Sequence, residues 1–326
     1  MVTQRISYKI KNWKEYNKSL VDRGRITLWL SDDLEDTWFC KEQSGRRGHP
    51  RQYSDAAIEL CLTLKHLYKL PYRATQGFVE SFLLLTGFTM TSPCYSQMNR
   101  RSGKLAVKLK RTSTDKGSLD IVVDSTGLKI YGEGEWKVRQ HGVSKRRTWR
   151  KLHLAVDPLD HEIVARRLTA NDKSDDQVFP DVLNDVEGEV ENSFGDGAYD
   201  KAGCYRACHE RGTKLIAPPN KLAIQQKKGK IKPELIQRDA YVNRINSLTL
   251  KLKDKEKARK QWKQEVDYHT RSISETAMFR FKTICGENLS SRLNETQQTE
   301  VHIKINILNQ FTKLGMPDSY PYQIDA

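Results

Sequence analysis

The hydrophobic period of the chain changes near residue 118, and this change restricts the fold more than any other feature. From there, SLDIVVDSTGLKIYG indicates a buried strand, a turn at 125–127 and a second short strand, followed by the strands RKLHLAVD and HEIVARRLT. The helical segments SDDQVFPDVLNDV and KAGCYRACHERG then alternate with the strand segments NSFGDGAYD and KLIAPP. An antiparallel start followed by alternating helix and strand predicts an α/β fold, a mixed sheet with helices on its faces.

The segment before residue 118 has a helical period. Apolar residues recur at helical spacing over 54–69, after Ser54 as the N-cap. A second helix opens at Pro71 and ends near Gly87, and a third begins within CYSQMNRRSGKL. Helices joined by tight turns are typical of a helix-turn-helix-like unit, and they are equally compatible with a plain helical bundle.

In a helix-turn-helix-like unit the later helix enters the major groove of DNA. Side chains on the third helix would then contact base edges or phosphates, whereas in a plain bundle they would only be exposed. The candidates for these contacts are Gln97, Arg100 and Arg101.

The charge balance favours a polyanionic partner. Lys and Arg number 56 against 41 Asp and Glu, which gives a net charge of +15. Cations that neutralise phosphates release counterions, so nucleic acid is the leading candidate. No apolar run approaches the roughly 20 residues that span a bilayer, and the first residues contain no signal-peptide core. We therefore expect no membrane association and a cytoplasmic protein that joins the nucleoid when it binds DNA.

The six cysteines are scattered, and none forms a CxxC pair. Cys204, Cys208 and His209 lie close in sequence but have no second ligand pair at zinc-finger spacing. We expect reduced thiols, and packing residues on a short helix. No Ser lies in a nucleophile-elbow motif, so His153 and His161 are interpreted as structural.

Two aspartates follow predicted strands of the sheet. Asp124 lies in DIVVDSTG and Asp196 in NSFGDGAYD, each with small residues beside it. Open α/β sheets bind ligands at the carboxyl ends of their strands, and small neighbours leave space for a metal ion and a phosphate. One such Asp is usually a turn residue that accepts backbone hydrogen bonds. Two on adjacent strands indicate a shared site.

A third acid lies in YHTRSISETAMFRFK, where Tyr268, Arg271, Glu275 and Lys282 are spaced by three, four and seven residues. These spacings predict one face of a helix, and the alternative is a solvated face with ordinary ion pairs. Together with the two aspartates, Glu275 predicts a carboxylate cluster. Hard oxygen ligands of this kind hold two Mg²⁺ (or Mn²⁺) ions for phosphodiester chemistry, with Asp124 bridging both ions.

The segments VVDSTGLKIYGEGEW, FGDGAYD and Y-x2-R-x3-E-x6-K resemble the DDE transposases of bacterial insertion sequences, in the group with the YREK signature. The resemblance covers most of the chain, because YRATQGFVESF and NILNQFTKLGMP are also similar to that group. It implies an RNase H-like core and a divalent-metal active site made of Asp124, Asp196 and Glu275. It also implies DNA cleavage and strand transfer, binding to terminal inverted repeats and to target DNA, and a homo-oligomer in the DNA complex.

Asp196 and Glu275 lie 79 residues apart (275 − 196), more than a compact core of this kind needs. The lysine-rich block from Asn220 to Lys263 is interpreted as an insertion, with a flexible charged loop as the alternative. The predicted segments are a basic N-terminal arm at 1–53, a helical DNA-binding domain at 54–112, the first part of the RNase H-like core at 116–219, the basic insertion at 220–263 and the C-terminal helices of the core at 264–320.

The run WKVRQHGVSKRRTWRK mixes cations with aromatic rings, which suits a DNA path; a solvated basic hairpin with core tryptophans is the alternative. Arg271 and Lys282 are expected at phosphates and Tyr268 at the flanking backbone, with an ion pair to Glu275 as the rival role of Arg271. The predicted DNA contacts within the run are Trp136, Lys137, His141, Arg147, Trp149, Arg150 and Lys151.

The predicted function is that of a DNA transposase that cleaves DNA at the ends of its element and joins the 3′-hydroxyl to target DNA. Two alternatives stay open. One is an RNase H-like nuclease without strand transfer, and the other is a DNA-binding regulator whose acids are inert.

Overall fold

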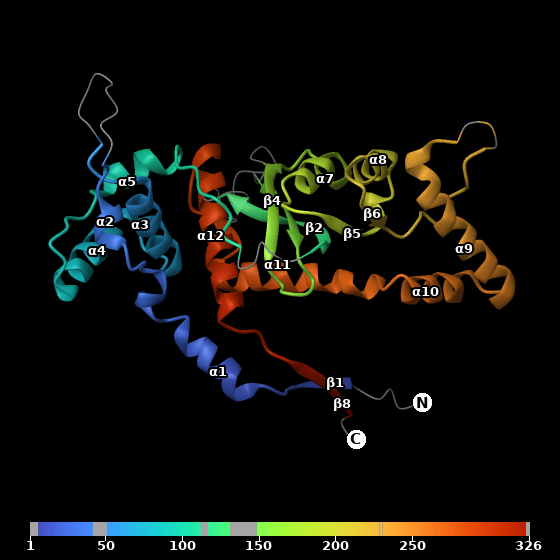
Figure 1. Ribbon diagram of the computed structural model, residues 1–326, viewed down its shortest axis with the longest axis horizontal. Coiled ribbons are helices and arrows are strands. Elements are labelled where there is room, and N and C mark those ends of the chain that lie inside the picture. The colour runs from blue at the N-terminus through green and yellow to red at the C-terminus, as the bar shows by residue number, and fades with distance from the viewer. Residues whose placement is uncertain are drawn as a thin grey trace, which may run out of the picture. The chain divides into compact units, whose positions relative to one another are not determined.

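The computed structural model describes residues 6–41, 51–111, 117–130, 149–227, 229 and 231–323 (Figure 1). The chain forms two compact units. The first comprises Met1–Lys108 with His302–Ala326, and the second is Leu109–Val301. The boundaries of these two units differ from those of the five segments predicted from sequence. The division into five segments remains a prediction.

The second unit is built on a six-stranded sheet with the order β4-β3-β2-β5-β6, and β7 pairs with β2 outside this path. Strands β2, β3 and β4 are antiparallel neighbours, whereas β5, β6 and β7 run parallel to β2. The mixed sheet confirms the predicted α/β, RNase H-like fold class. Its strands are β2 (Leu119–Ile130), β3 (Trp149–Val156), β4 (Ile163–Ala170), β5 (Val190–Phe194), β6 (Lys214–Ile216) and β7 (Asn288–Leu289).

Helices cover both faces of this sheet. Figure 1 shows α7 (Asp175–Asn184) and α8 (Ala202–Arg211) on one face and α11 (Ser272–Cys285) on the other. Side chains alternate along a strand, so Ile121 packs with α7 and α8 while Val122 lies in a separate cluster on the opposite face. Asp124 therefore points to the face covered by α11.

The predicted turn at 125–127 is wrong, because β2 runs unbroken from Leu119 to Ile130. Residues 126 and 127 pair with Leu152 and Lys151 of β3. The Ser-Thr-Gly sequence has the composition of a turn, but the ladder to β3 satisfies its backbone groups and keeps the strand extended.

The lysine-rich block contains a helical hairpin made of α9 (Ile236–Leu252) and α10 (Lys255–Glu265). The two helices share a small core of Ile245, Leu248, Ala258 and Trp262. The charged-loop alternative is therefore wrong for residues 236–265.

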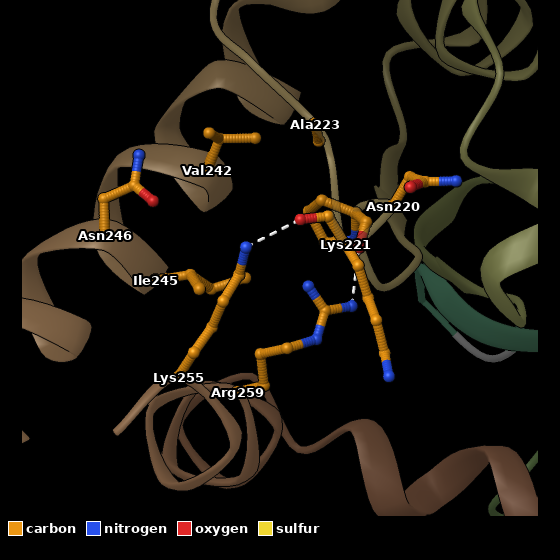
Figure 2. Close-up of a pocket in the computed structure, with 9 residues that line it drawn as sticks. Asn220, Lys221, Ala223, Val242, Ile245, Asn246, Lys255 and Arg259 are labelled. Atoms are coloured by element: carbon orange, nitrogen blue, oxygen red, sulfur yellow. Dashed lines mark hydrogen bonds between the residues drawn. The ribbon is translucent and has the colours of Figure 1, made fainter. Parts of the chain in front are cut away.

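Hydrogen bonds join this hairpin to the loop that follows β6. Lys255 Nζ donates to the carbonyl of Lys221 at 2.7 Å, and Arg259 Nη2 donates to the carbonyl of Pro219 at 2.6 Å (Figure 2). Arg238 of α9 binds the buried carboxylate of Asp200 through Nε at 2.7 Å and Nη2 at 3.2 Å. The cations of the hairpin thus hold it against the core.

The first unit contains the three predicted helices, which pack on one another. Ser54 caps the first of them by accepting the Ala57 N–H at 3.0 Å, as predicted. Gly87 ends the second in the left-handed region, with φ 76°. The helices of this unit are α1 (Trp13–Asp22), α2 (Leu34–Trp38), α3 (Asp55–Leu67), α4 (Tyr72–Thr86), α5 (Tyr95–Ser102) and the later part of α12 (Asn294–Leu314).

A two-stranded antiparallel ribbon joins the two ends of the chain in this unit. It pairs β1 (Ile6–Ile10) with β8 (Ser319–Gln323). Asn12 reinforces the pairing, because its side chain donates to the Met316 carbonyl at 3.0 Å and accepts the Asp318 N–H at 2.8 Å.

Candidate active site

Asp124 lies on β2 just beyond the point where the neighbouring strand ends. The last residue of β5, Phe194, pairs with Val122, so the edge of β2 is open beside Asp124. Asp124 Oδ1 accepts the Ser125 N–H at 2.8 Å, and Oδ2 lies 3.3 Å from Ser274 Oγ. The carboxylate is thus held from β2 itself and from α11.

Burial raises the pKa of Asp124, and the charge of nearby Asp196 raises it further. The Ser125 N–H, the Arg271 guanidinium and the Ser274 hydroxyl act in the opposite direction without cancelling the effect of burial. Two negative charges share a poorly solvated place, and a cation between them would relieve both the desolvation and the repulsion.

Asp196 follows β5 by two residues and begins the short 3₁₀ turn η2 (Gly197–Tyr199), where its Oδ1 accepts the Ala198 N–H at 2.8 Å. The glycine before it was expected to leave space for a metal ion. The structure gives it a different role, because a Cβ on Gly195 would lie 2.7 Å from Cδ2 of the buried Tyr199 ring. Because Gly195 has no side chain, the Tyr199 ring can pack directly against the backbone next to Asp196.

Glu275 lies in the first turn of α11 with a largely exposed side chain. Its Oε1 accepts Arg271 Nη1 at 2.7 Å, while Arg271 Nη2 lies 3.4 Å from Asp124 Oδ2. One guanidinium therefore joins the first and third predicted acids. The predicted ion pair between Arg271 and Glu275 is present.

Within the described ranges, no three acidic, histidine or cysteine side chains lie close enough to hold a metal ion together. The donor set fits a divalent ion all the same. Its members are carboxylates, which Mg²⁺ and Mn²⁺ prefer, and Arg271 already supplies positive charge between Asp124 and Glu275.

The stripe from Tyr268 to Lys282 is not a single helix, so this prediction is wrong. Tyr268–Arg271 forms a 3₁₀ turn, η4, and α11 begins only at Ser272. Asp267 precedes the turn with φ 50°, a left-handed conformation that separates it from α10. Arg271 is nevertheless the last residue of this 3₁₀ turn and directly precedes α11, whose first turn contains Glu275.

Tyr268 packs against the apolar cluster of Val122, Phe194 and Ile216. Burial raises the pKa of its hydroxyl to about 12. Lys282 lies in the last turn of α11 and makes no ion pair with any residue of the described segments. Tyr268 is therefore partly structural, whereas Lys282 keeps its charge available.

The basic run is only partly described. Trp136, Lys137, His141 and Arg147 lie outside the described residues. Three of its members, Trp149, Arg150 and Lys151, belong to β3 and have partners within the protein. The ring centre of Trp149 lies 5.7 Å from Lys129 Nζ. Arg150 Nε donates to Gln297 Oε1 at 2.9 Å, and Lys151 Nζ lies 3.0 Å from Asp175 Oδ1. Their role at DNA remains a prediction.

The three candidates on α5 differ in their surroundings. Gln97 accepts the Cys94 N–H at 3.2 Å and so caps its own helix. Arg101 binds the carboxylate of Asp55 and the carbonyl of Tyr53, which ties α5 to the start of α3. Arg100 is exposed and, among the described residues, bonds only to a carbonyl one turn earlier, at 3.3 Å. Of the two arginines, Arg100 has the more accessible charge.

Sequence reasoning missed two side chains around the predicted acids. Ser274 is fully buried, and its hydroxyl lies 2.8 Å from the Arg271 carbonyl and 3.3 Å from Asp124 Oδ2. Asp175 lies 3.3 Å from Nδ1 of His153, the residue that pairs with Ser125. The only sequence signal for Ser274 is its position next to Glu275, and the place of Asp175 depends on how α7 packs on the sheet.

An RNase H-like sheet with carboxylates beside the open edge of its central strand defines an enzyme of metal-dependent polynucleotide transfer. Two family models, both described as Transposase DDE domain, match residues 21–133 and 115–310. The second match covers more than half of the chain. The chain therefore belongs to the DDE transposases and is a metal-dependent DNA transposase, as predicted.

Among solved structures, the chain is similar to one described as a cryo-EM structure of the piggyBac transposase synaptic complex with hairpin DNA. The sequence identity is 10% and the TM-score 0.44, over 90% of this chain and 75% of that one. In the part of this chain that the structure describes, no helix is long and apolar enough to cross a membrane.

Proposed function

We propose that Asp124, Asp196 and Glu275 form the catalytic carboxylate set of this transposase and hold two Mg²⁺ or Mn²⁺ ions. The observation that carries the proposal is the bridge of Arg271 between Asp124 and Glu275, which brings the third acid to the open edge of β2. The nearby charge of Asp196 on the half-buried Asp124 supports it. When bound, such ions would activate a water or a 3′-hydroxyl and stabilise the leaving oxygen.

The remaining side chains of the site bind and orient the substrate. Arg271 and Lys282 contact the phosphates beside the scissile bond, and Tyr268 lies against the flanking backbone. Ser274 and the Ser125 N–H keep the Asp124 carboxylate directed toward the open edge of the sheet. The apolar residues of α11, including the fully buried Phe281, pack the helix that carries Glu275 against the core.

The DNA partners in this proposal are the terminal inverted repeats of a bacterial insertion sequence of the YREK group and the target DNA. The enzyme acts as a homo-oligomer, because two ends must be held together, and it works in the cytoplasm at the nucleoid. In the sequence, the helical domain at 54–112 precedes the core, and the basic insertion at 220–263 separates its two parts. The side chains proposed at DNA, besides those at the scissile bond, are Gln97, Arg100, Arg101, Trp136, Lys137, His141, Arg147, Trp149, Arg150 and Lys151.

The test compares Asp124→Asn, Asp196→Asn and Glu275→Gln with the unchanged protein on DNA that carries the element ends. Each variant is expected to bind the ends normally in a gel shift and to lose Mg²⁺-dependent cleavage. Glu287→Gln is a matched control, because Glu287 is an exposed acid of the same unit that pairs with Lys129. Full cleavage by any of the three variants would remove that residue from the set.

A second assay addresses the joining step. A precut end with a free 3′-hydroxyl is supplied together with a target plasmid. The transposase is expected to insert the end into the plasmid. Cleavage without insertion would instead identify a nuclease.

A further inference from the structure

Phe279 is an exposed aromatic side chain on α11, the helix that carries Glu275. It is 70% exposed, whereas the nearby Met278 and Phe281 are buried. Phe279 is therefore not one of the residues that pack α11 against the core. Single exposed apolar residues are ordinary on protein surfaces, so exposure alone gives this residue no role.

The position of Phe279 on α11 connects it with the active site. At about 100° per residue, Phe279 lies about 40° from Glu275 around the helix, and Lys282 lies about 20° from Glu275 in the other direction. Phe279 follows Glu275 by roughly one helical turn, or about 6 Å along the axis. The side chain of Glu275 is 63% exposed, so both side chains reach solvent on the same face of α11.

DNA that reaches Glu275 also covers Phe279. The acids of a DDE transposase act on a phosphodiester bond, and in the proposed function Glu275 holds a metal ion at that bond. The major groove of DNA alone is about 12 Å wide, which is more than the distance between the two residues along the helix. The nucleotides beside the scissile phosphate therefore lie within reach of the Phe279 ring.

The chemistry of the ring restricts which part of the DNA it contacts. A phenyl ring has no charge for a phosphate, and Arg271 and Lys282 supply that charge before and after it in the chain. The flat face of a base is the complementary surface, because bases stack on aromatic side chains. Inside a duplex, neighbouring bases cover both faces of each base. Cleavage at the element end removes one neighbour and exposes one face of the terminal base.

We propose that Phe279 stacks on the terminal base of the cut element end and so holds the new 3′-hydroxyl at the active site for the joining step. The inference rests on the proposed function of Glu275 as a metal ligand. Stacking on a base face does not depend on which base it is, so Phe279 contributes affinity for a cut end rather than recognition of its sequence. The contact forms only after cleavage.

The experiment measures the Kd of the full-length protein for two DNA duplexes without divalent metal, so that no cleavage occurs. One duplex ends at the cut position of the element, and the other continues into flanking DNA. Phe279→Ala is expected to raise the Kd for the precut duplex about tenfold, within the range of about 5- to 150-fold for the loss of one stacked base, and to leave the Kd for the uncut duplex unchanged. A terminal 2-aminopurine, whose fluorescence is quenched by stacking, should be quenched by the unchanged protein and not by Phe279→Ala.

Two further variants and a control separate stacking from other contacts. Phe279→Trp keeps an aromatic ring and should preserve the affinity for the precut duplex and the quenching. Phe279→Leu keeps an apolar side chain without a π-face and should behave as Phe279→Ala. Leu250→Ala is the matched control, because Leu250 is an 82% exposed apolar residue on helix α9 of the same unit, and it is expected to bind both duplexes normally.

An unchanged Kd for the precut duplex in Phe279→Ala would overturn the stacking role. An equal loss of affinity for both duplexes, or full affinity and quenching in Phe279→Leu, would overturn it as well. The proposed function fails separately, because these measurements involve neither metal nor cleavage: Glu275→Gln would then cleave DNA normally. Loss of cleavage in Glu275→Gln together with normal precut binding by Phe279→Ala contradicts only the stacking role.

Discussion

Arg271 joins Asp124 to Glu275 through the two ends of one guanidinium, at 3.4 Å from Asp124 Oδ2 and 2.7 Å from Glu275 Oε1. The sequence left two roles open for this arginine, a phosphate contact and an ion pair with Glu275. The structure contains the ion pair. Both roles are compatible if a phosphate replaces the carboxylates as the partner of Arg271 when the substrate binds.

Replacing Arg271 with Ala is expected to separate these roles. The DNA-free protein should bind Mn²⁺ more tightly, because a cation that competes for Asp124 and Glu275 is gone. Cleavage should fall about 10- to 100-fold, as expected for the loss of a charged hydrogen bond of about 1.5–3 kcal/mol. Calorimetry and a single-turnover cleavage assay measure the two effects. Arg271→Lys keeps the positive charge but loses the planar guanidinium, so its cleavage rate should lie between those of the unchanged protein and Arg271→Ala. Cleavage by Arg271→Ala at the rate of the unchanged protein would exclude a phosphate contact by Arg271.

Gly195→Ala is expected to displace the Tyr199 ring and, with it, the neighbouring Asp196. The added Cβ would lie 2.7 Å from Cδ2 and 2.9 Å from Cγ of the Tyr199 ring. Forcing the ring aside should destabilise the fold by about 1–3 kcal/mol and move the adjacent Asp196. Gly203→Ala is the control, because nothing lies within 4 Å of its added Cβ and helix α8 favours Ala by up to about 1 kcal/mol. Urea unfolding and cleavage assays compare Gly195→Ala with Gly203→Ala. Equal stability of the two variants would show that the Tyr199 ring does not require a glycine at position 195.

Arg238→Ala tests how the hairpin is anchored. It would leave the carboxylate of Asp200, 2% exposed, without its cation, and breaking a buried pair typically costs about 3–5 kcal/mol. Arg244→Ala on the same helix breaks only the exposed pair with Glu265, so its effect should be far smaller. Chemical denaturation measures both free energies of unfolding, and similar values would show that the buried pair does not anchor α9.

The stability difference between the unchanged protein and Asp175→Asn should depend on pH. Hydrogen bonds hold the pKa of the folded Asp175 below its ordinary value of 3.8. A depressed pKa contributes stability that is fully present above the unfolded value and is lost as pH falls through the folded one. The difference should therefore be largest at neutral pH and should narrow below about pH 4. Urea unfolding at several pH values measures it, and a difference independent of pH would contradict the ionised state.

The succession of strands along the chain and the place of Asp196 after β5 could be predicted from sequence, because apolar runs and small residues are local signals. Asp124 was expected after a strand and instead lies within β2, because the pairing with β3 keeps the following residues extended. The contact between His153 and Asp175 could not be predicted. It requires the pairing of β3 within the sheet, together with the packing of α7 on that face of the sheet. Neither is encoded within a short window of residues.

Two further elements were hidden for different reasons. Helix α10 consists of polar and charged residues except for Ala258 and Trp262, which are buried, so its apolar period is too sparse to detect. Strand β8 contains Pro321 and finds its partner at the other end of the chain. Proline and a distant partner both weaken a strand signal.

The β1–β8 ribbon has a consequence for synthesis on the ribosome. Asn12 and Asp318, which bond to each other, are separated by 306 positions, so the first unit cannot close until residues 319–323 have emerged. The second unit ends at Val301 and is complete earlier. Domains fold as units while the chain is made. The catalytic sheet can therefore form on the ribosome before the ribbon that closes the first unit.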